Sequence, residues 1–190
     1  KINYKLFKNV DVIFTSLPNG ESQKIANKLL KRNIMIDLSA DFRLKNPKIY
    51  NKYYGIKHIS LNNLKKSVYG LSEINKKNLS KAKVIACPGC YPTSILLPLF
   101  PLIKKNLIDF KNIIIDSKSG FSGAGRGVHK KFKNKNLYGS TSAYGIASHR
   151  HNAEIQQELS YVKKNIEFTF TPHILPMFRG ILSTIYLRYK

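Results

Sequence analysis

The sequence predicts an α/β protein in two parts. Residues 1–89 form part of a domain built on parallel strands, and residues 90–190 form an α+β domain with a mixed or antiparallel sheet. Three observations lead to this prediction. In the first part, apolar runs typical of strands are separated by a segment with helical spacing. The second part ends in segments in which apolar and polar residues alternate, as in strands. Neither a repeat nor a linker lies between the two parts.

The first part opens with a strand, a helix and a strand. The β-branched run at residues 10–14 is typical of a buried strand, residues 21–32 are apolar at helical spacing, and residues 34–38 form the next strand. Such a unit implies a parallel pair joined by a right-handed crossover. Residues 41–80 are rich in Asn, Lys and Tyr and are expected to be looser, and residues 83–86 form a third strand.

The second part opens with an apolar helix over residues 91–105. Pro92 is tolerated near the first turn, whereas Pro98 and Pro101 are expected to kink or end the helix. A fourth strand follows over residues 112–117.

A glycine-rich, basic loop is expected over residues 118–145. Residues 152–162 then form a helix with Asn152 as its N-cap. Residues 167–171 and 181–189 alternate strongly, which predicts antiparallel strands of a second sheet. This order of elements is typical of a dinucleotide-type domain that leads into a catalytic domain.

The composition restricts the class of protein. The formal net charge of +23 would point to nucleic acid or an anionic surface, but 27 of the 33 basic residues are Lys and only 6 are Arg. We interpret Lys as the default cation, so that each Arg marks a place where a planar fork is needed. No stretch approaches a membrane span, no signal-peptide pattern is present, and two cysteines cannot build a disulfide framework. A cytoplasmic location is therefore expected.

Cys90 follows a strand and a glycine turn and falls where a helix starts. A thiol there meets unpaired N–H groups and the positive end of the helix dipole, which favours the thiolate. The carboxyl edge of a parallel sheet is also where α/β proteins bind ligands. Two alternatives remain: a small buried cysteine, and a redox pair of Cys87 with Cys90. A zinc site would need two more ligands, and none is obvious in the sequence.

Two histidines form the second signal. In an extended segment His149 and His151 point to the same side, and an imidazole suits a base that returns its proton at neutral pH. Glu154 could orient one imidazole or simply lie well in the first helical turn. A solvated histidine pair beside a helix start is the alternative.

The glycine-rich stretch Ser119–Arg126 forms the third signal. Small residues let a backbone approach a flat or anionic ligand, although a flexible loop is the alternative. It is not a Walker loop, because Arg126 and Gly127 stand where Lys and Ser or Thr are required.

Arginines concentrate in these motifs. Arginine forks recognise carboxylate and phosphate, so several of them near a thiol suggest a phosphorylated, carboxylated substrate. Pairing with an acid, such as Asp41 with Arg43, is the structural alternative. The four arginines in candidate motifs are Arg43, Arg126, Arg150 and Arg179.

Six stretches together resemble one family. They cover most of the chain in that family's order: Asp37–Leu44, Tyr69–Asn75, Pro88–Ser94, Ser119–Arg126, His149–Ile155 and Phe170–Tyr186. The chain resembles the N-acetyl-γ-glutamyl-phosphate reductases of arginine biosynthesis, which are relatives of the aspartate-semialdehyde dehydrogenases.

The resemblance implies a Rossmann-type first domain and a reaction. The family reduces N-acetyl-γ-glutamyl phosphate to N-acetylglutamate 5-semialdehyde with NADPH, releases phosphate, and passes through a cysteine thioester. The nucleophile falls on Cys90 and the general base on His151. No metal is implied, and the full-length protein is expected to be a homo-oligomer that binds a small acyl phosphate but neither nucleic acid nor membrane.

The resemblance also suggests further site residues. Arg43 is the candidate for the substrate phosphate. The other candidates for the substrate are Tyr144, His149, Arg150, Glu154 and Arg179. The candidates for contact with NADPH are Ser16, Leu17, Pro18, Ser119, Gly120, Ser122 and Gly123.

The chain departs from the family in two respects. Cys87 stands where the family has Asn, so Cys87 is expected not to be catalytic, and a reversible disulfide with Cys90 is a hypothesis. The family's glycine-rich first turn is absent and the last strand ends with the chain. We therefore expect a fragment lacking both ends, which binds NADPH poorly and folds poorly alone.

Three alternatives remain open. A sister reductase of aminoadipate in lysine biosynthesis would use the same thiolate chemistry. A nucleic-acid-binding module would need clustered charge with exposed aromatics, and the only dense basic tract is Lys130–Lys135. A redox module would need both cysteines for its activity.

Overall fold

The computed structural model describes residues 2–124 and 139–190. The chain separates into two compact units, Lys1–Gly89 and Cys90–Lys190, and each is described by itself. Arg126 and the tract Lys130–Lys135 lie outside the described residues.

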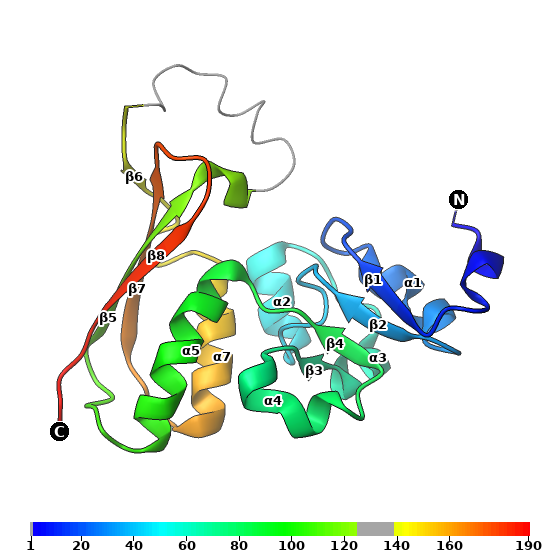
Figure 1. Cartoon of the computed structure of the whole chain (residues 1–190), viewed down its shortest axis with the longest axis horizontal. Coiled ribbons are helices and arrows are strands. Elements are labelled where there is room, and N and C mark those ends of the chain that lie inside the picture. The colour runs from blue at the N-terminus through cyan, green and yellow to red at the C-terminus, as the bar shows by residue number, and fades with distance from the viewer. Residues whose placement is uncertain (1, 125–138) are drawn as a thin grey trace. The chain divides into compact units, whose positions relative to one another are not determined.

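The first unit contains a four-stranded parallel sheet in the order β1-β2-β4-β3 (Figure 1). Its strands are β1 (Val12–Thr15), β2 (Ile34–Asp37), β3 (Val68–Tyr69) and β4 (Val84–Ala86). Helix α1 (Ser22–Leu29) connects β1 to β2, so the expected parallel crossover unit is confirmed. A short 3-10 helix, η1 (Tyr4–Phe7), precedes β1.

One face of this sheet is buried and the other is not. Ile13 and Met35 pack with Leu29 of α1 in one apolar cluster, because alternate residues of a strand point to the same side. On the second face of β1, the side chain of Phe14 is 70% exposed. The sequence predicted a buried strand here, which is correct for only one face.

Residues 41–80 contain more structure than the sequence predicted. They form helices α2 (Pro47–Tyr54), α3 (Leu61–Lys66) and α4 (Ser72–Leu79) in addition to β3. The ends of α2 carry readable signals that composition concealed. Asn46 Oδ1 accepts from Lys48 N, Pro47 begins the helix, and Gly55 ends it with a φ of 68°.

The second unit contains a mixed four-stranded sheet in the order β6-β7-β5-β8. Its strands are β5 (Ile113–Gly120), β6 (Ser142–Ala143), β7 (Phe168–Leu175) and β8 (Ile181–Tyr186). Helices α5 (Cys90–Lys104) and α7 (His151–Val162) lie side by side on one face of the sheet (Figure 1). A 3-10 helix, η2 (Phe121–Ala124), continues β5.

The two last strands run in opposite directions in the second sheet, as the sequence predicted, but β5 lies between them, parallel to β7 and antiparallel to β8. The connection from β5 to β7 contains β6 and α7, and the segment 176–180 crosses the end of β5 before β8 begins. Alternation marks a half-buried strand but does not specify its neighbour.

Helix α5 continues through both internal prolines, where a kink or an end was expected. Pro98 and Pro101 are exposed, whereas Ile95 and Leu99 of the same helix are buried. The carbonyl groups that each proline leaves without an N–H partner therefore lie on the side of the helix that faces water.

Candidate functional site

Cys90 is the first residue of α5, directly after the turn that follows β4, and its side chain is exposed. The strand-to-helix junction predicted from the sequence is therefore present. A thiol at this position meets the amino end of a helix of 15 residues, where N–H groups lack intrahelical partners. A helix amino end is a position that favours the thiolate form of a cysteine.

Tyr91 lies next to Cys90 and is almost fully buried, with 2% of its surface exposed. Its ring packs edge to face against two imidazoles: the centroids are 5.7 Å from His149 and 5.9 Å from His151. Phe170 of β7 closes the group, with ring centroids 5.3 Å from Tyr91 and 5.6 Å from His149. One buried ring therefore joins the start of α5 to both candidate histidines.

The two histidines lie together, with ring centroids 4.8 Å apart. The sequence predicted an extended segment that places these side chains on the same side. The structure has no extended segment here, because a turn ends at His149 and α7 begins at His151. The helix starts one residue before the predicted N-cap Asn152, and Arg150 occupies the N-cap position. Backbone turning, not strand alternation, brings the imidazoles together.

His149 has a defined proton arrangement. The backbone N–H of His151 donates to His149 Nδ1 over 3.1 Å, so the ring proton of neutral His149 lies on Nε2. Burial, assisted by the charge of Arg150, lowers the pKa of His149 to about 4. At neutral pH His149 is thus an uncharged ring that presents an N–H donor.

A set of hydroxyl groups extends the cluster. Tyr91 OH lies 2.8 Å from Ser119 Oγ and 3.0 Å from Tyr144 OH. The ring of Tyr144 packs edge to face on His149 at 5.5 Å, and Tyr144 N donates to the carbonyl oxygen of Pro172. Tyr144, His149 and Ser119, which the sequence assigned separately to substrate and cofactor, are therefore within one contact network.

The glycine-rich stretch is partly strand. Ser119 and Gly120 belong to β5, and Gly120 N, Phe121 N and Ser122 N donate to carbonyls of the segment 177–180. A Cβ on Gly120 would lie 2.8 Å from Arg179 N, so the chain crossing above it explains this glycine. Gly123, in contrast, is exposed and has open space around it.

The remaining candidates of the second unit lie in different environments. Glu154 is buried on α7 with 1% exposed surface, and Arg150 is exposed at the start of that helix. Arg179 is exposed between β7 and β8, with its guanidinium carbon 5.7 Å above the ring of Phe178. Ring contacts therefore connect His149 with both His151 and Tyr144, whereas the ring that lies beneath the Arg179 guanidinium is Phe178.

In the first unit, Arg43 and Cys87 both follow carboxyl ends of the parallel strands. Arg43 is 9% exposed and donates from Nη2 to the Leu38 carbonyl over 2.9 Å. Burial raises the pKa of the Cys87 thiol, while the positive charge of Arg43 acts in the opposite direction. The Arg43 guanidinium is therefore close enough to act on the Cys87 thiol. Burial of the Cys87 side chain favours the neutral form of that thiol.

The residues after β1 were expected to approach a cofactor. Ser16 and Pro18 are exposed and Leu17 is half-buried at the carboxyl edge of the sheet. The amino end of α1, however, is occupied by a side chain of the protein: Asp41 accepts from Gly20 N at 2.7 Å and from Gln23 N at 3.0 Å. This helix end does not offer its N–H groups to a phosphate.

Sequence reasoning missed Tyr91 and Phe170 as members of the site. Their aromatic character favours a core role, and Phe170 also lies in an alternating strand pattern. One signal could have indicated Tyr91: a tyrosine inside an apolar helix needs a partner for its hydroxyl, and that partner had to come from another element.

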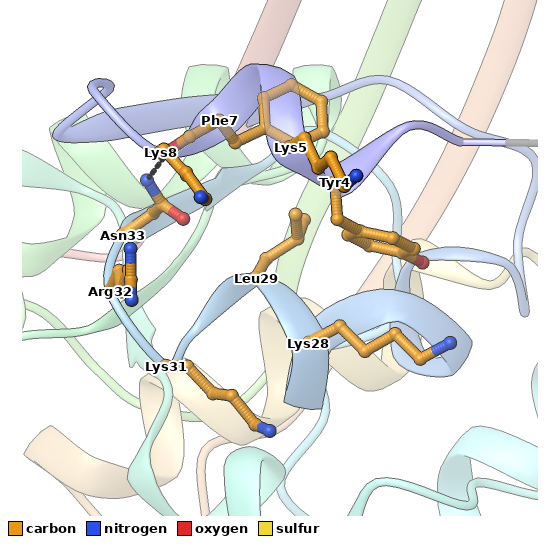
Figure 2. A pocket seen from close by; sticks show the side chains of 9 residues that line it. All are labelled: Tyr4, Lys5, Phe7, Lys8, Lys28, Leu29, Lys31, Arg32 and Asn33. Carbon is orange, nitrogen blue, oxygen red and sulfur yellow. Dashed lines mark hydrogen bonds between the residues drawn. The ribbon is translucent and has the colours of Figure 1, made fainter.

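A cavity of about 250 Å³ lies at the opposite edge of the first sheet, at the amino ends of β1 and β2 (Figure 2). Its lining combines five cations with apolar residues and one amide: Lys5, Lys8, Lys28, Lys31, Arg32, Tyr4, Phe7, Leu29 and Asn33. Lys28 Nζ lies 5.1 Å above the Tyr4 ring, and Tyr4 and Phe7 pack against the core. The rings are therefore engaged within the protein, unlike the exposed platforms that stack on nucleic-acid bases.

Residues 2–124 and 139–190 contain no group of three or more His, Cys, Asp or Glu residues that could hold a metal ion. Within the same ranges, none of the helices combines the length and the apolar character that crossing a membrane requires.

Fold and site together define the class: an α/β protein in two units, with an exposed thiol at a helix amino end, next to a tyrosine ring that contacts two imidazoles. Residues 90–190 match the family model of the semialdehyde dehydrogenase dimerisation domain, and residues 1–82 match that of the semialdehyde dehydrogenase NAD binding domain. The chain belongs to the semialdehyde dehydrogenase family.

The resemblance to one branch of this family is confirmed by curated relatives. The chain is 49% identical over 182 residues to N-acetyl-gamma-glutamyl-phosphate reductase of Alkaliphilus metalliredigens, a match that covers 95% of the chain and 53% of that relative. It is 49% identical over 186 residues to the probable chloroplastic enzyme of that name from Arabidopsis thaliana, covering 95% of the chain and 45% of the relative. The chain thus spans about half the length of these relatives.

Solved structures confirm the fold. Aspartate semialdehyde dehydrogenase II from Vibrio cholerae aligns with a TM-score of 0.68 at 14% identity, over 100% of this chain and 57% of that one. Aspartate semialdehyde dehydrogenase with NADP from Candida albicans aligns with a TM-score of 0.57 at 14% identity, over 94% of this chain and 51% of that one. The predicted α/β class, with a parallel and a mixed sheet, is therefore correct.

Proposed function

We propose that this chain carries the thiol chemistry of an NADPH-dependent reductase that converts N-acetyl-γ-glutamyl phosphate to N-acetylglutamate 5-semialdehyde and phosphate in arginine biosynthesis. The observation that carries the proposal is the exposed Cys90 at the start of α5, next to the ring that contacts His149 and His151. The names of the curated relatives support the choice of substrate.

The first step is an acyl transfer to Cys90. His151 takes the proton of the Cys90 thiol, and the thiolate attacks the acyl carbon, so that a C–S bond forms. The bond from the acyl carbon to the phosphate oxygen then breaks, and inorganic phosphate leaves with the electron pair. The product of this step is a Cys90 thioester, and no electrons have been gained or lost.

The two histidines have different duties in this proposal. His149 is neutral at pH 7 and presents Nε2–H, so it can donate a hydrogen bond to the oxygen that becomes negative during the attack. When the reduced thiohemiacetal collapses to the aldehyde, its C–S bond breaks and His151 returns its proton to the departing Cys90 sulfur. Arg43 is proposed for the phosphate, because an arginine fork binds phosphate oxygens in pairs.

The remaining proposed substrate residues are Tyr144, Arg150, Glu154 and Arg179. The proposed thiolate chemistry requires reduced Cys90, which is consistent with the cytoplasm expected from the sequence.

The residues present fit part of an NADPH site. Ser16 and Pro18 are exposed at the carboxyl edge of the parallel sheet, and Ser119 and Gly123 are the proposed contacts in the second unit. NADPH supplies the hydride for the reduction when it is bound. The amino end of α1 is occupied by Asp41, so the phosphates of the cofactor need another anchor. This supports the expectation that the 190-residue chain alone binds NADPH weakly.

The second unit is also proposed to form a homo-oligomer. Helices α5 and α7 cover one face of its sheet, whereas Ile114, Leu182 and Tyr186 on the other face are 50%, 62% and 57% exposed. The match to a dimerisation domain supports a second copy as the occupant of this uncovered face.

A single-turnover assay tests the proposal without NADPH. The chain is mixed with N-acetyl-γ-glutamyl phosphate, and released phosphate and a thioester mass increase on Cys90 are measured. We expect one phosphate per chain in the parent and in Cys87→Ala, and none above background in Cys90→Ala.

Three outcomes would contradict parts of the proposal. Equal phosphate release by Cys90→Ala would remove the thioester step. Loss in both cysteine variants would favour the redox pair instead. Faster release from the acyl phosphate of aminoadipate than from that of acetylglutamate would assign the sister reaction.

A further inference from the structure

Tyr91 has more contacts with the candidate site than its place in an apolar helix requires. Its ring contacts His149, His151 and Phe170, and its hydroxyl lies near Ser119 and Tyr144. These partners lie on the turn before α7, on α7 itself, on β7, on β5 and beside β6. The residue next to the candidate nucleophile is thus the common contact of the other elements.

The hydroxyl of Tyr91 has a direction. It donates to Ser119 Oγ at 2.8 Å, with a longer approach of 3.4 Å to the His173 carbonyl. A phenol has a single proton, so Tyr144 is the donor in the 3.0 Å contact between the two tyrosines. Burial raises the pKa of Tyr91, which keeps this proton in place throughout the working pH range. The Tyr144 proton is therefore directed at the Tyr91 oxygen.

The ring of Tyr91 has a different effect. Its edge-to-face contacts, at interplanar angles of 83° and 73°, favour the observed orientation of each imidazole against it. The ring also helps to exclude water from His149, whose low pKa comes first from burial.

We propose that Tyr91 is a positioning residue: its ring orients the two imidazoles, and its hydroxyl holds the Tyr144 side chain in place by accepting its hydrogen bond. The proposal deepens the proposed function and rests on it. Ring and hydroxyl have separable effects, because Tyr91→Phe removes only the hydroxyl and Tyr91→Leu removes both.

Single-turnover phosphate release from N-acetyl-γ-glutamyl phosphate measures the two effects. For Tyr91→Phe we expect a half-saturating concentration raised by about 5-fold with a rate constant within 2-fold of the parent, because one hydrogen bond that positions Tyr144 is lost. For Tyr91→Leu we expect the rate constant to fall by about 100-fold, because the imidazoles lose their fixed orientation.

NMR titration of the histidine ring protons gives a second readout that needs no turnover. The charged or titratable groups that face His149 are Arg150, His151, Tyr91 and Tyr144. In Tyr91→Leu the pKa of His149 is expected to rise from about 4 toward the ordinary value of 6.5, and in Tyr91→Phe to stay low. Tyr161→Phe and Tyr161→Leu are the matched controls, since Tyr161 lies on α7 with 65% of its surface exposed.

The outcomes separate this proposal from the proposed function. If the parent releases no phosphate, the titration still decides the role of the ring. An unchanged His149 pKa in a folded Tyr91→Leu overturns the role of the ring, and an unchanged half-saturating concentration in Tyr91→Phe overturns the role of the hydroxyl. If Tyr91→Leu does not fold, Tyr91→Phe still decides the role of the hydroxyl.

Discussion

At the scale of single residues, buried polar side chains organise the first unit. Asp41 is fully buried and accepts hydrogen bonds from Gly20 N, Gln23 N and Tyr50 OH. It thereby caps α1, whose own N-cap residue, Glu21, makes no capping hydrogen bond with its side chain. Arg43, which the sequence offered as a partner for Asp41, donates from Nη2 to the carbonyl oxygen of Leu38.

Two histidines make stability depend on pH, because burial lowers the pKa of both His58 and His149. The pKa of His149 is about 4 in the folded chain against 6.5 ordinarily, so the unfolded chain binds more protons between these values. The contribution of neutral His149 to the free energy of unfolding is complete above pH 6.5 and is lost as the pH falls toward 4. Urea unfolding midpoints at pH 7 and pH 4.5 measure it.

His149→Gln is the matched variant, because a glutamine oxygen can still accept from the His151 N–H. We expect the parent to lose more stability than His149→Gln between the two pH values. An equal loss would show that His149 is not buried in its neutral form.

At the scale of elements, strand β5 shows how burial alternates within one strand. Ile115 is 0% exposed and its neighbour Ile114 is 50% exposed, although both are isoleucines of the same strand. We expect Ile115→Ala to lower the free energy of unfolding by about 2–5 kcal/mol through lost burial and a cavity.

Ile114→Ala is the control, with an expected loss below about 1 kcal/mol in the unassembled chain, because half of that side chain already faces solvent. Equilibrium urea unfolding at low protein concentration checks both variants. Equal losses would show that β5 is not covered on one face only.

At the scale of the whole molecule, the uncovered face of the second sheet predicts assembly. Leu182→Lys places a charge on this face, where Leu182 is 62% exposed, so assembly rather than folding is expected to be lost. Sedimentation velocity should show a dimer for the parent and a monomer for the variant.

Ile59→Lys is the matched control, because Ile59 is also 62% exposed but lies in the first unit. It should assemble like the parent. A monomeric parent, or a dimeric Leu182→Lys, would contradict the assignment of this face.

The sequence alone was sufficient for features encoded by neighbouring residues. The crossover of β1, α1 and β2 follows from periodicity, and Cys90 at a strand-to-helix junction follows from the glycine turn before it. The resemblance of six stretches along the chain was sufficient to indicate the family, which the matches confirm.

Only the tertiary structure decided which distant residues meet. Tyr91 contacts Ser119, 28 residues away, and Tyr144, 53 residues away, and the crossing of β5 by the segment 176–180 places β5 between β7 and β8. The physical reason is that periodicity reports which side of an element is buried but not which partner covers it. The thiol could therefore be found from the sequence, whereas the side chain that organises its surroundings could not.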